Sequence, residues 1–201
     1  MRKGSTKERI LECALNLFSE RGYDGVGVDE IAREAGIKGP SLYRHFKGKK
    51  EILKAIVQKV EKHYSDNFEK SVAFVKTPDS LSGFEKMTME QIEFSISDST
   101  LRKARKFLSK EQFRSDRLAA LTTRHFRTEI EETYAAVFEK MMDAGLLKRS
   151  DPGILAMEYV SPVTVLIHMC DREPERIPEA MALIRQHIAH FINTYGVNGN
   201  G

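Results

Sequence analysis

The chain has 201 residues, which is enough for one or two small domains. Its hydrophobic content of 41% and charged content of 30% are typical of a soluble globular protein. Because no apolar run reaches about 18 residues and the N-terminus lacks an apolar core, the sequence argues against a membrane span and a signal peptide. Cys13 and Cys170 are far apart, so neither a disulfide framework nor a CxxC metal site is expected. We therefore expect a cytoplasmic protein in a reducing compartment.

The net charge of +3 is unevenly distributed along the chain. Residues 1–63 contain 14 Lys and Arg against 9 Asp and Glu, whereas the remaining residues contain 18 against 20. A positive excess at one end fits a polyanionic partner that is bound by one domain only. Because an excess of this size is also common by chance, it can only support other signals.

The first elements in the chain are predicted to form a three-helix unit over residues 5–46. Ser5 and Glu8 have the spacing of a capping box, which opens a helix. Gly22 ends this helix, and residues 23–27 form a turn. Apolar residues recur at helical spacing in between, at Ile10, Leu11, Ala14, Leu15 and Phe18.

Two short amphipathic helices are expected next, within residues 29–46, separated by a turn from Gly36 to Gly39. The second of them places Leu42 and Phe46 on one face. The first has its apolar face at Val28, Ile31, Ala32 and Ala35. Helices this short must pack on each other and on a neighbour. This layout is typical of a helix-turn-helix, whose second helix can lie in the DNA major groove.

The second short helix has a polar face that a buried helix would not have. Pro40 suits its first position, and the side chains of Ser41, Tyr43, Arg44 and His45 lie off the apolar face. The flanking lysines are Lys38, Lys47, Lys49 and Lys50. Together these groups predict a helix that reads DNA phosphates and bases. Arg44 is our candidate for a guanine contact, since a guanidinium group can pair bidentately with that base.

The rest of the chain is predicted to be helical throughout, which makes the fold all-α. A long helix from residue 49 to about 75 can serve as a rigid connector, and residues 77–79 break it. Further helices are expected near 80–97, 100–111, 115–145, 152–171 and 175–195, and Pro162 is expected to kink or divide its helix. We predict a helix-turn-helix domain over residues 1–47 and a helical domain over residues 48–201.

The last two predicted helices are apolar around most of their circumference, so they must be buried on most sides. One interpretation is burial against a second copy of the chain in a four-helix interface, and the other is that they form the core of the monomer. The candidate interface residues are Met157, Val165, Ile184, Ile188 and Phe191.

Aromatic and Met residues in the second domain suit an adaptable apolar cavity for a partly apolar small molecule. The alternative is that most of them are ordinary core residues. The candidate lining residues are Met87, Phe94, Phe107, Phe113, Phe126 and Tyr134. The strongly basic segment 102–117 is either a solvated face or a site that attracts an anion.

Signals for a metal, a cofactor or an enzyme are weak. Residues 168–170 (HMC) and the pair His187 and His190 lack the full ligand set of a closed metal site. We find no Ser-His-Asp spacing, no glycine-rich phosphate loop and no HExxH motif. We therefore expect no metal, no cofactor and no catalytic residues.

Four motifs together resemble the TetR family of bacterial transcriptional regulators. They agree with it in order, spacing and residue type over about 30 of the 201 residues. They are Gly22-Tyr23, residues 28–36 (VDEIAREAG), residues 41–46 (SLYRHF) and residues 49–53 (KKEIL). The resemblance implies a homodimeric repressor with an operator-binding N-terminal domain, a C-terminal pocket and a dimer formed by the last two helices. A small molecule in the pocket would release double-stranded operator DNA.

The resemblance also implies roles for single residues. Tyr43 would contact phosphate or a thymine methyl group, and His45 and Lys49 would bind phosphate. Gly39, Pro40 and Ser41 would approach base edges. Two departures stand out: the family often has Ser or Thr at positions 27 and 28 and a longer polar side chain at position 39. Base readout is then expected to shift to Lys38 and Arg44.

Two other functions remain open from the sequence. One is a DNA-binding module that responds to no ligand, either an activator or a nucleoid-associated factor. The other is an enzyme with an accessory DNA-binding domain.

Overall fold

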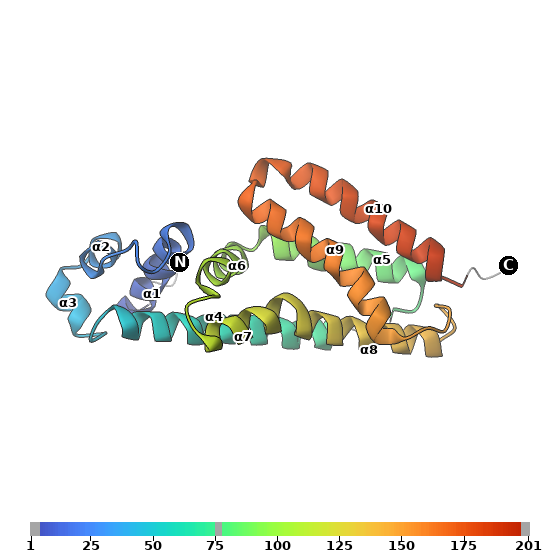
Figure 1. The fold of residues 1–201 in the computed structure, drawn as a ribbon, viewed down its shortest axis with the longest axis horizontal. Coiled ribbons are helices and arrows are strands. Elements are labelled where there is room, and N and C mark those ends of the chain that lie inside the picture. The colour runs from blue at the N-terminus through green and yellow to red at the C-terminus, as the bar shows by residue number, and fades with distance from the viewer. Residues whose placement is uncertain (1–4, 75–77, 198–201) are drawn as a thin grey trace. The chain divides into compact units, whose positions relative to one another are not determined.

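The computed structural model of the protein describes residues 5–74 and 78–197, and the side chains of all these residues except 65–74. The described chain is all-α, as predicted (Figure 1). One isolated antiparallel bridge joins Leu147 and Gly196. The α-helices are α1 (Thr6–Arg21), α2 (Val28–Glu34), α3 (Gly39–Tyr43), α4 (Lys49–Phe74), α5 (Leu81–Ser97), α6 (Ser99–Glu111), α7 (Asp116–Thr123), α8 (Glu129–Asp143), α9 (Pro152–Arg172) and α10 (Ile177–Tyr195).

The contacts within the chain divide it into two compact units. Unit 1 comprises residues up to Asp66 together with Ser99–Thr122, and unit 2 comprises Asn67–Asp98 and the residues from Thr123 onward. Helix α4 therefore contributes residues to both units. The division differs from the expected boundary at residue 47, because α6 and most of α7 group with the N-terminal helices. Whether residues 1–47 act as a separate functional domain stays a prediction.

Helix α1 begins and ends as its sequence predicts. The capping box is complete, since the Glu8 backbone N–H donates to Ser5 Oγ at 3.2 Å and the Ser5 backbone N–H donates to Glu8 Oε2 at 2.6 Å. At the other end Gly22 has φ +73°, a conformation that L side chains rarely adopt. The apolar face of α1 packs along α6, which buries Leu101, Phe107 and Leu108.

Unit 2 is built around an aromatic core. Phe84 of α5, Phe138 of α8, Tyr159 of α9 and Phe191 of α10 are almost wholly buried. Their ring centroids lie 4.8 to 6.5 Å apart. Rings at these separations attract one another in addition to the apolar area that they bury.

The helix expected over residues 115–145 consists of three consecutive helical segments. Between α7 and α8, Arg124–Thr128 forms one π-helical turn, which accommodates an extra residue within a continuous helix. His125 is buried in this turn, and its Nδ1 lies 2.7 Å from Glu129 Oε2.

Helix α9 continues through Pro162 and is not divided there. By length and composition α9 could cross a membrane, with a mean hydropathy of 1.4. This is weak evidence, because the core helix of a soluble protein passes the same test. The burial of Leu155, Tyr159 and Val163 in the core of unit 2 accounts for much of the apolar character of α9.

Three of the candidate dimer residues belong to the core of a single chain. Ile184, Ile188 and Phe191 are at most 2% exposed, so they have no surface left for a second copy to contact. The prediction of direct contact has to be corrected for these three. Met157 and Val165 are 41% and 64% exposed and remain candidates.

Candidate nucleic-acid interface

The turn between α2 and α3 has the geometry of a helix C-cap. Gly36 adopts φ +64°, its N–H donates to the Arg33 carbonyl at 3.0 Å, and the Ile37 N–H donates to the Ala32 carbonyl at 2.9 Å. These bonds satisfy carbonyls that the end of α2 leaves open. The chain can therefore reverse at Gly36 and start α3 at Gly39.

Helix α3 is held in place by two buried side chains. Leu42 and Phe46 are 0% and 2% exposed, and α2 presents Ile31 and Ala32 to the same small core. Because α3 has only five residues, its orientation depends on these contacts rather than on its own stability.

The opposite side of α3 is polar and exposed. Tyr43 is 54% exposed, and Lys38, Pro40, Arg44 and His45 are also exposed. The helix is shorter than expected and ends at Tyr43, so Arg44 is its C-cap and His45 follows it. Arg44 Nη2 donates to Ser41 Oγ at 2.7 Å, which steadies the guanidinium group beside the helix.

The structure shows the two positions at which the sequence departs from the family pattern. Gly27 precedes α2 without a side-chain cap, which confirms the missing hydroxyl cap. Gly39 lies near Asp29, since a Cβ atom added at Gly39 would meet Asp29 Oδ1 at 3.4 Å. This is an ordinary contact distance, so the backbone leaves room for a larger residue at position 39.

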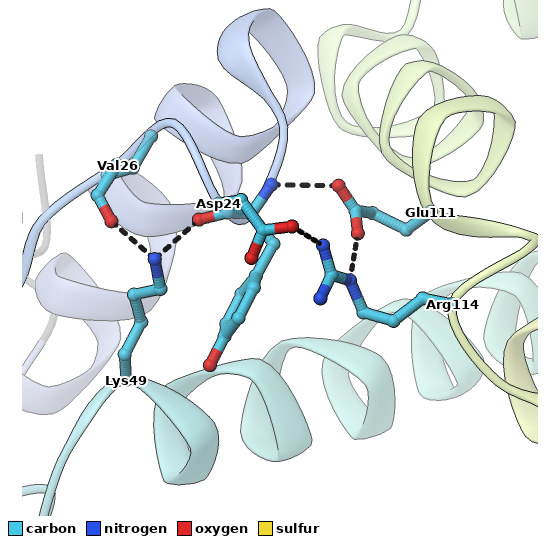
Figure 2. Close-up of polar contacts among 6 residues, drawn as sticks. Asp24, Val26, Lys49, Glu111 and Arg114 are labelled. Carbon is cyan, nitrogen blue, oxygen red and sulfur yellow. Dashed lines mark hydrogen bonds and ion pairs between the residues drawn. The ribbon is translucent and has the colours of Figure 1, made fainter.

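Lys49 is half-buried and bonds to the chain itself (Figure 2). Its Nζ donates to the backbone carbonyls of Tyr23 and Val26 at 2.6 and 2.7 Å, and it lies 4.2 Å from the centroid of the Tyr23 ring. The ammonium group thus holds the turn between α1 and α2. The phosphate contact of Lys49 stays a prediction. The third N–H of its ammonium group could donate to a phosphate, since the other two donate to backbone carbonyls.

Glu111 at the end of α6 binds the same turn, as Figure 2 shows. The Tyr23 backbone N–H donates to Glu111 Oε1 at 2.8 Å, and Glu111 Oε2 forms an ion pair with Arg114 Nε. Arg114 Nη2 in turn bonds to Asp24 Oδ2 at 2.6 Å, and its guanidinium group lies 4.6 Å from the Tyr23 ring centroid. No sequence signal indicated this network, because Tyr23 and Glu111 are 88 residues apart.

The electrostatics of the turn follow from these contacts. The hydrogen bond from Arg114 lowers the pKa of Asp24 below its ordinary value. Burial raises the pKa of the Tyr23 phenol. On the α2 side, an ion pair with Arg21 lowers the pKa of Glu30. The turn that precedes α2 is therefore fixed by ionised groups at neutral pH.

The six candidate pocket residues are divided between the two units. Phe107 and Phe113 belong to unit 1, where Phe107 is buried between helices and Phe113 is 92% exposed. In unit 2, Phe94 is 49% exposed, and the Phe126 ring lies 4.4 Å from the His168 ring. Met87 and Tyr134 pack against the core of unit 2. In the part of the chain that the structure describes, no group of three or more His, Cys, Asp or Glu side chains could hold a metal ion.

A short helix that is anchored by buried side chains and presents Tyr, Arg, His and Lys side chains is typical of a helix-turn-helix DNA-binding protein. Residues 10–56 match the family model of the bacterial regulatory proteins of the tetR family. Residues 10–56 are therefore the DNA-binding region typical of this family. Its members are DNA-binding transcription regulators and not enzymes.

Two curated relatives are similar to part of the chain. The negative transcriptional regulator IcaR of the biofilm operon icaADBC is 40% identical over 60 residues in Staphylococcus epidermidis and 48% identical over 52 residues in Staphylococcus aureus. These matches cover 30% and 26% of this chain and only 32% and 28% of the relatives. The matches therefore span only about a third of the length of these curated relatives.

Solved structures resemble the chain over nearly its whole length. SmeT, the repressor of the Stenotrophomonas maltophilia multidrug efflux pump SmeDEF, has a TM-score of 0.67 at 23% identity and covers 97% of this chain and 92% of its own. A SmeT–triclosan complex has a TM-score of 0.69 at 24% identity, with 98% and 94% covered. The ketosteroid regulator KstR2 of Mycobacterium tuberculosis has a TM-score of 0.69 at 19% identity, with 98% of both chains covered. At these identities the likeness shows the fold.

Proposed function

We propose that the protein is a cytoplasmic homodimeric repressor that binds operator DNA through α3 and releases it when a small molecule binds unit 2. The observation that carries the proposal is the exposed Tyr43, presented between the buried anchors Leu42 and Phe46. A side chain that is 54% exposed on a fixed helix is placed to contact DNA without rearrangement.

The DNA contacts that we propose follow the exposed polar groups. Tyr43 and His45 contact the sugar-phosphate backbone, whereas Arg44 and Lys38 read base edges in the major groove. Pro40, Ser41 and Gly39 approach the bases. Lys49 serves mainly to position α2 and α3, since its ammonium group already donates to two backbone carbonyls in the turn that precedes α2.

The proposed dimer uses the exposed side of α9. Ile154, Met157 and Val165 are 56%, 41% and 64% exposed and recur at helical spacing on this helix, and Leu183 of α10 is 42% exposed. Exposed apolar side chains on one helix face favour a partner surface. A helix-turn-helix reader also gains affinity when a two-fold dimer binds two half-sites. Sedimentation that shows a single chain per particle with and without DNA would contradict this part.

The repressor role and the effector draw support from relatives. IcaR is a negative regulator, SmeT is a repressor and one SmeT structure contains triclosan. Since α4 contributes residues to both units, it provides a covalent route from a ligand in unit 2 to the reading helix. A coupling of about 1–3 kcal/mol between the two sites would be enough for regulation.

The test is to select bound fragments from the source genome and titrate the best fragment with wild-type protein and with Tyr43→Ala. We expect a short near-palindromic site, and we expect Tyr43→Ala to weaken binding by about 10-fold or more, the worth of one good DNA contact. The matched control is Phe113→Ala, which removes another exposed aromatic ring of unit 1 outside α2 and α3 and should bind as wild type does. Weak DNA binding that falls steeply with salt and is equal for wild type and Tyr43→Ala would contradict the proposal.

A further inference from the structure

The beginning of α1 reaches the segment that follows α3. Lys7, in the first turn of α1, places its Nζ 5.5 Å from the centroid of the Phe46 ring. Phe46 comes three residues after Tyr43, the last residue of α3, and directly follows His45. A helix outside the helix-turn-helix pair therefore brings a positive charge to the C-terminal side of α3.

The ammonium group of Lys7 is not neutralised within the described chain. Lys7 is exposed, and it forms no ion pair or hydrogen bond through its side chain in the part of the chain that the structure describes. The adjacent carboxylate, that of Glu8, accepts the Ser5 backbone N–H at 2.6 Å and so completes the capping box of α1. An exposed cation without a counter-charge is available to a polyanion.

The Phe46 ring keeps the Lys7 ammonium group close to α3. The ring is buried, because it anchors α3 in the small core of the helix-turn-helix, so its position is fixed. The negative face of an aromatic ring attracts a cation at this separation. The three N–H groups of the ammonium can still donate to an acceptor outside the protein.

The place of Lys7 decides which part of a DNA molecule it can meet. The major groove is about 12 Å wide, so the ends and flanks of a helix that lies in it face the sugar-phosphate backbones rather than the base edges. Lys47 directly follows Phe46, is exposed, and likewise has no ion pair among the described residues. Lysines from two different elements therefore border the Phe46 ring.

We propose that Lys7, together with Lys47, binds a backbone phosphate of the operator beside the C-terminal end of α3. Helix α1 is then a DNA-binding element as well as a support for α2 and α3. The inference rests on the proposed function, because it requires α3 to lie in the major groove. A phosphate contact carries no sequence information, so Lys7 adds affinity for any DNA and leaves the choice of operator to α3.

The test is the salt dependence of DNA binding by Lys7→Gln, titrated with the selected operator at several salt concentrations. Each neutralised phosphate contributes about 0.9 to the slope of log K against log salt, so the slope should become shallower by about that amount for each bound chain. At ~0.1 M salt this slope corresponds to an affinity loss of about 8-fold for each bound chain. A fragment of unrelated sequence should show the same loss.

Two further variants separate the charge of Lys7 from its packing. Lys7→Arg keeps the charge and should keep the wild-type slope. The matched control is Lys110→Gln, at another exposed lysine of unit 1 without an ion pair among the described residues, and it should keep both slope and affinity. The melting temperature of each variant is measured as well, because a lysine that only covers the Phe46 ring would change the melting temperature and not the slope.

The outcomes distinguish this contact from the DNA reader. An unchanged slope in Lys7→Gln, or a loss confined to the operator, would overturn the phosphate contact, whereas weaker binding by Tyr43→Ala would still support α3 as the reader. A shallower slope in Lys7→Gln that Lys7→Arg restores would support the contact. Failure of the wild type to bind any selected fragment would overturn both.

Discussion

In unit 1 charged groups hold the turn that precedes α2, whereas unit 2 is held by aromatic rings. In unit 1 the buried carboxylate of Glu111, the guanidinium group of Arg114 and the ammonium group of Lys49 all converge on the turn at Tyr23. In unit 2 Phe84, Phe138, Tyr159 and Phe191 pack against one another. Charged hydrogen bonds depend on direction, pH and salt, whereas ring packing depends mainly on buried area. The DNA-reading unit should therefore be the more sensitive of the two to solution conditions.

The largest expected effect comes from Phe138→Ala. Phe138 is 0% exposed, and its ring packs on those of Tyr159 and Phe191. Truncation of a buried Phe lowers the free energy of unfolding by about 3–5 kcal/mol. Urea unfolding at low and high salt should show the same loss, and amide hydrogen exchange should place it in α8–α10. Phe94→Ala, at a ring that is 49% exposed, is the control and should cost much less. Equal loss of protection in α1 would show that the two units unfold as one.

Glu111→Gln is expected to lower the free energy of unfolding by less, and the loss should lie in unit 1. The amide can still accept the Tyr23 N–H, but it cannot form an ion pair with Arg114. Hydrogen bonds to charged groups contribute about 1.5–3 kcal/mol, so the free energy of unfolding should fall by about that amount. Hydrogen exchange should speed up in the turn around Tyr23. Glu20→Gln, at an exposed position on α1, is the control and should change neither. A loss of hydrogen-exchange protection confined to unit 2 would contradict the idea that charged groups stabilise unit 1 in particular.

The smallest effect is expected in acid. Because Arg114 lowers the folded pKa of Asp24 below 3.8, the ionised carboxylate stabilises the fold above that pH. This stabilisation is lost as the pH falls through the folded pKa. Wild type should therefore be slightly more stable than Asp24→Asn near neutral pH, and the difference should vanish in strong acid. Urea midpoints measured from neutral pH down to acid would show this, and a difference that widens in acid would refute it.

Local signals in the sequence were enough to predict most helices. Ser5 and Glu8 fix the start of α1 because a capping box needs only residues three apart. Gly22 and Gly36 end their helices with positive φ, which few other residues adopt. The exposed polar face of α3 followed from the spacing of Leu42 and Phe46. These features depend on neighbours within one or two turns.

Features that depend on distant contacts could not be predicted. Ile184 and Ile188 recur at helical spacing, which shows that their face is buried but not whether the same chain or a second copy covers it. The bond from Tyr23 to Glu111 joins residues that are far apart in the sequence.

The position of Lys49 makes it a built-in reporter for chemical labelling. Reagents that acylate amines react with exposed lysines, and Lys38, Lys47 and Lys50 are exposed. The Lys49 amine is bonded to two carbonyls, so it should be labelled only in molecules whose turn at Tyr23 has opened. Mass spectrometry would give the ratio of label on Lys49 to label on Lys47. That ratio would report the fraction of molecules whose turn at Tyr23 is open, in a living cell as well as in solution.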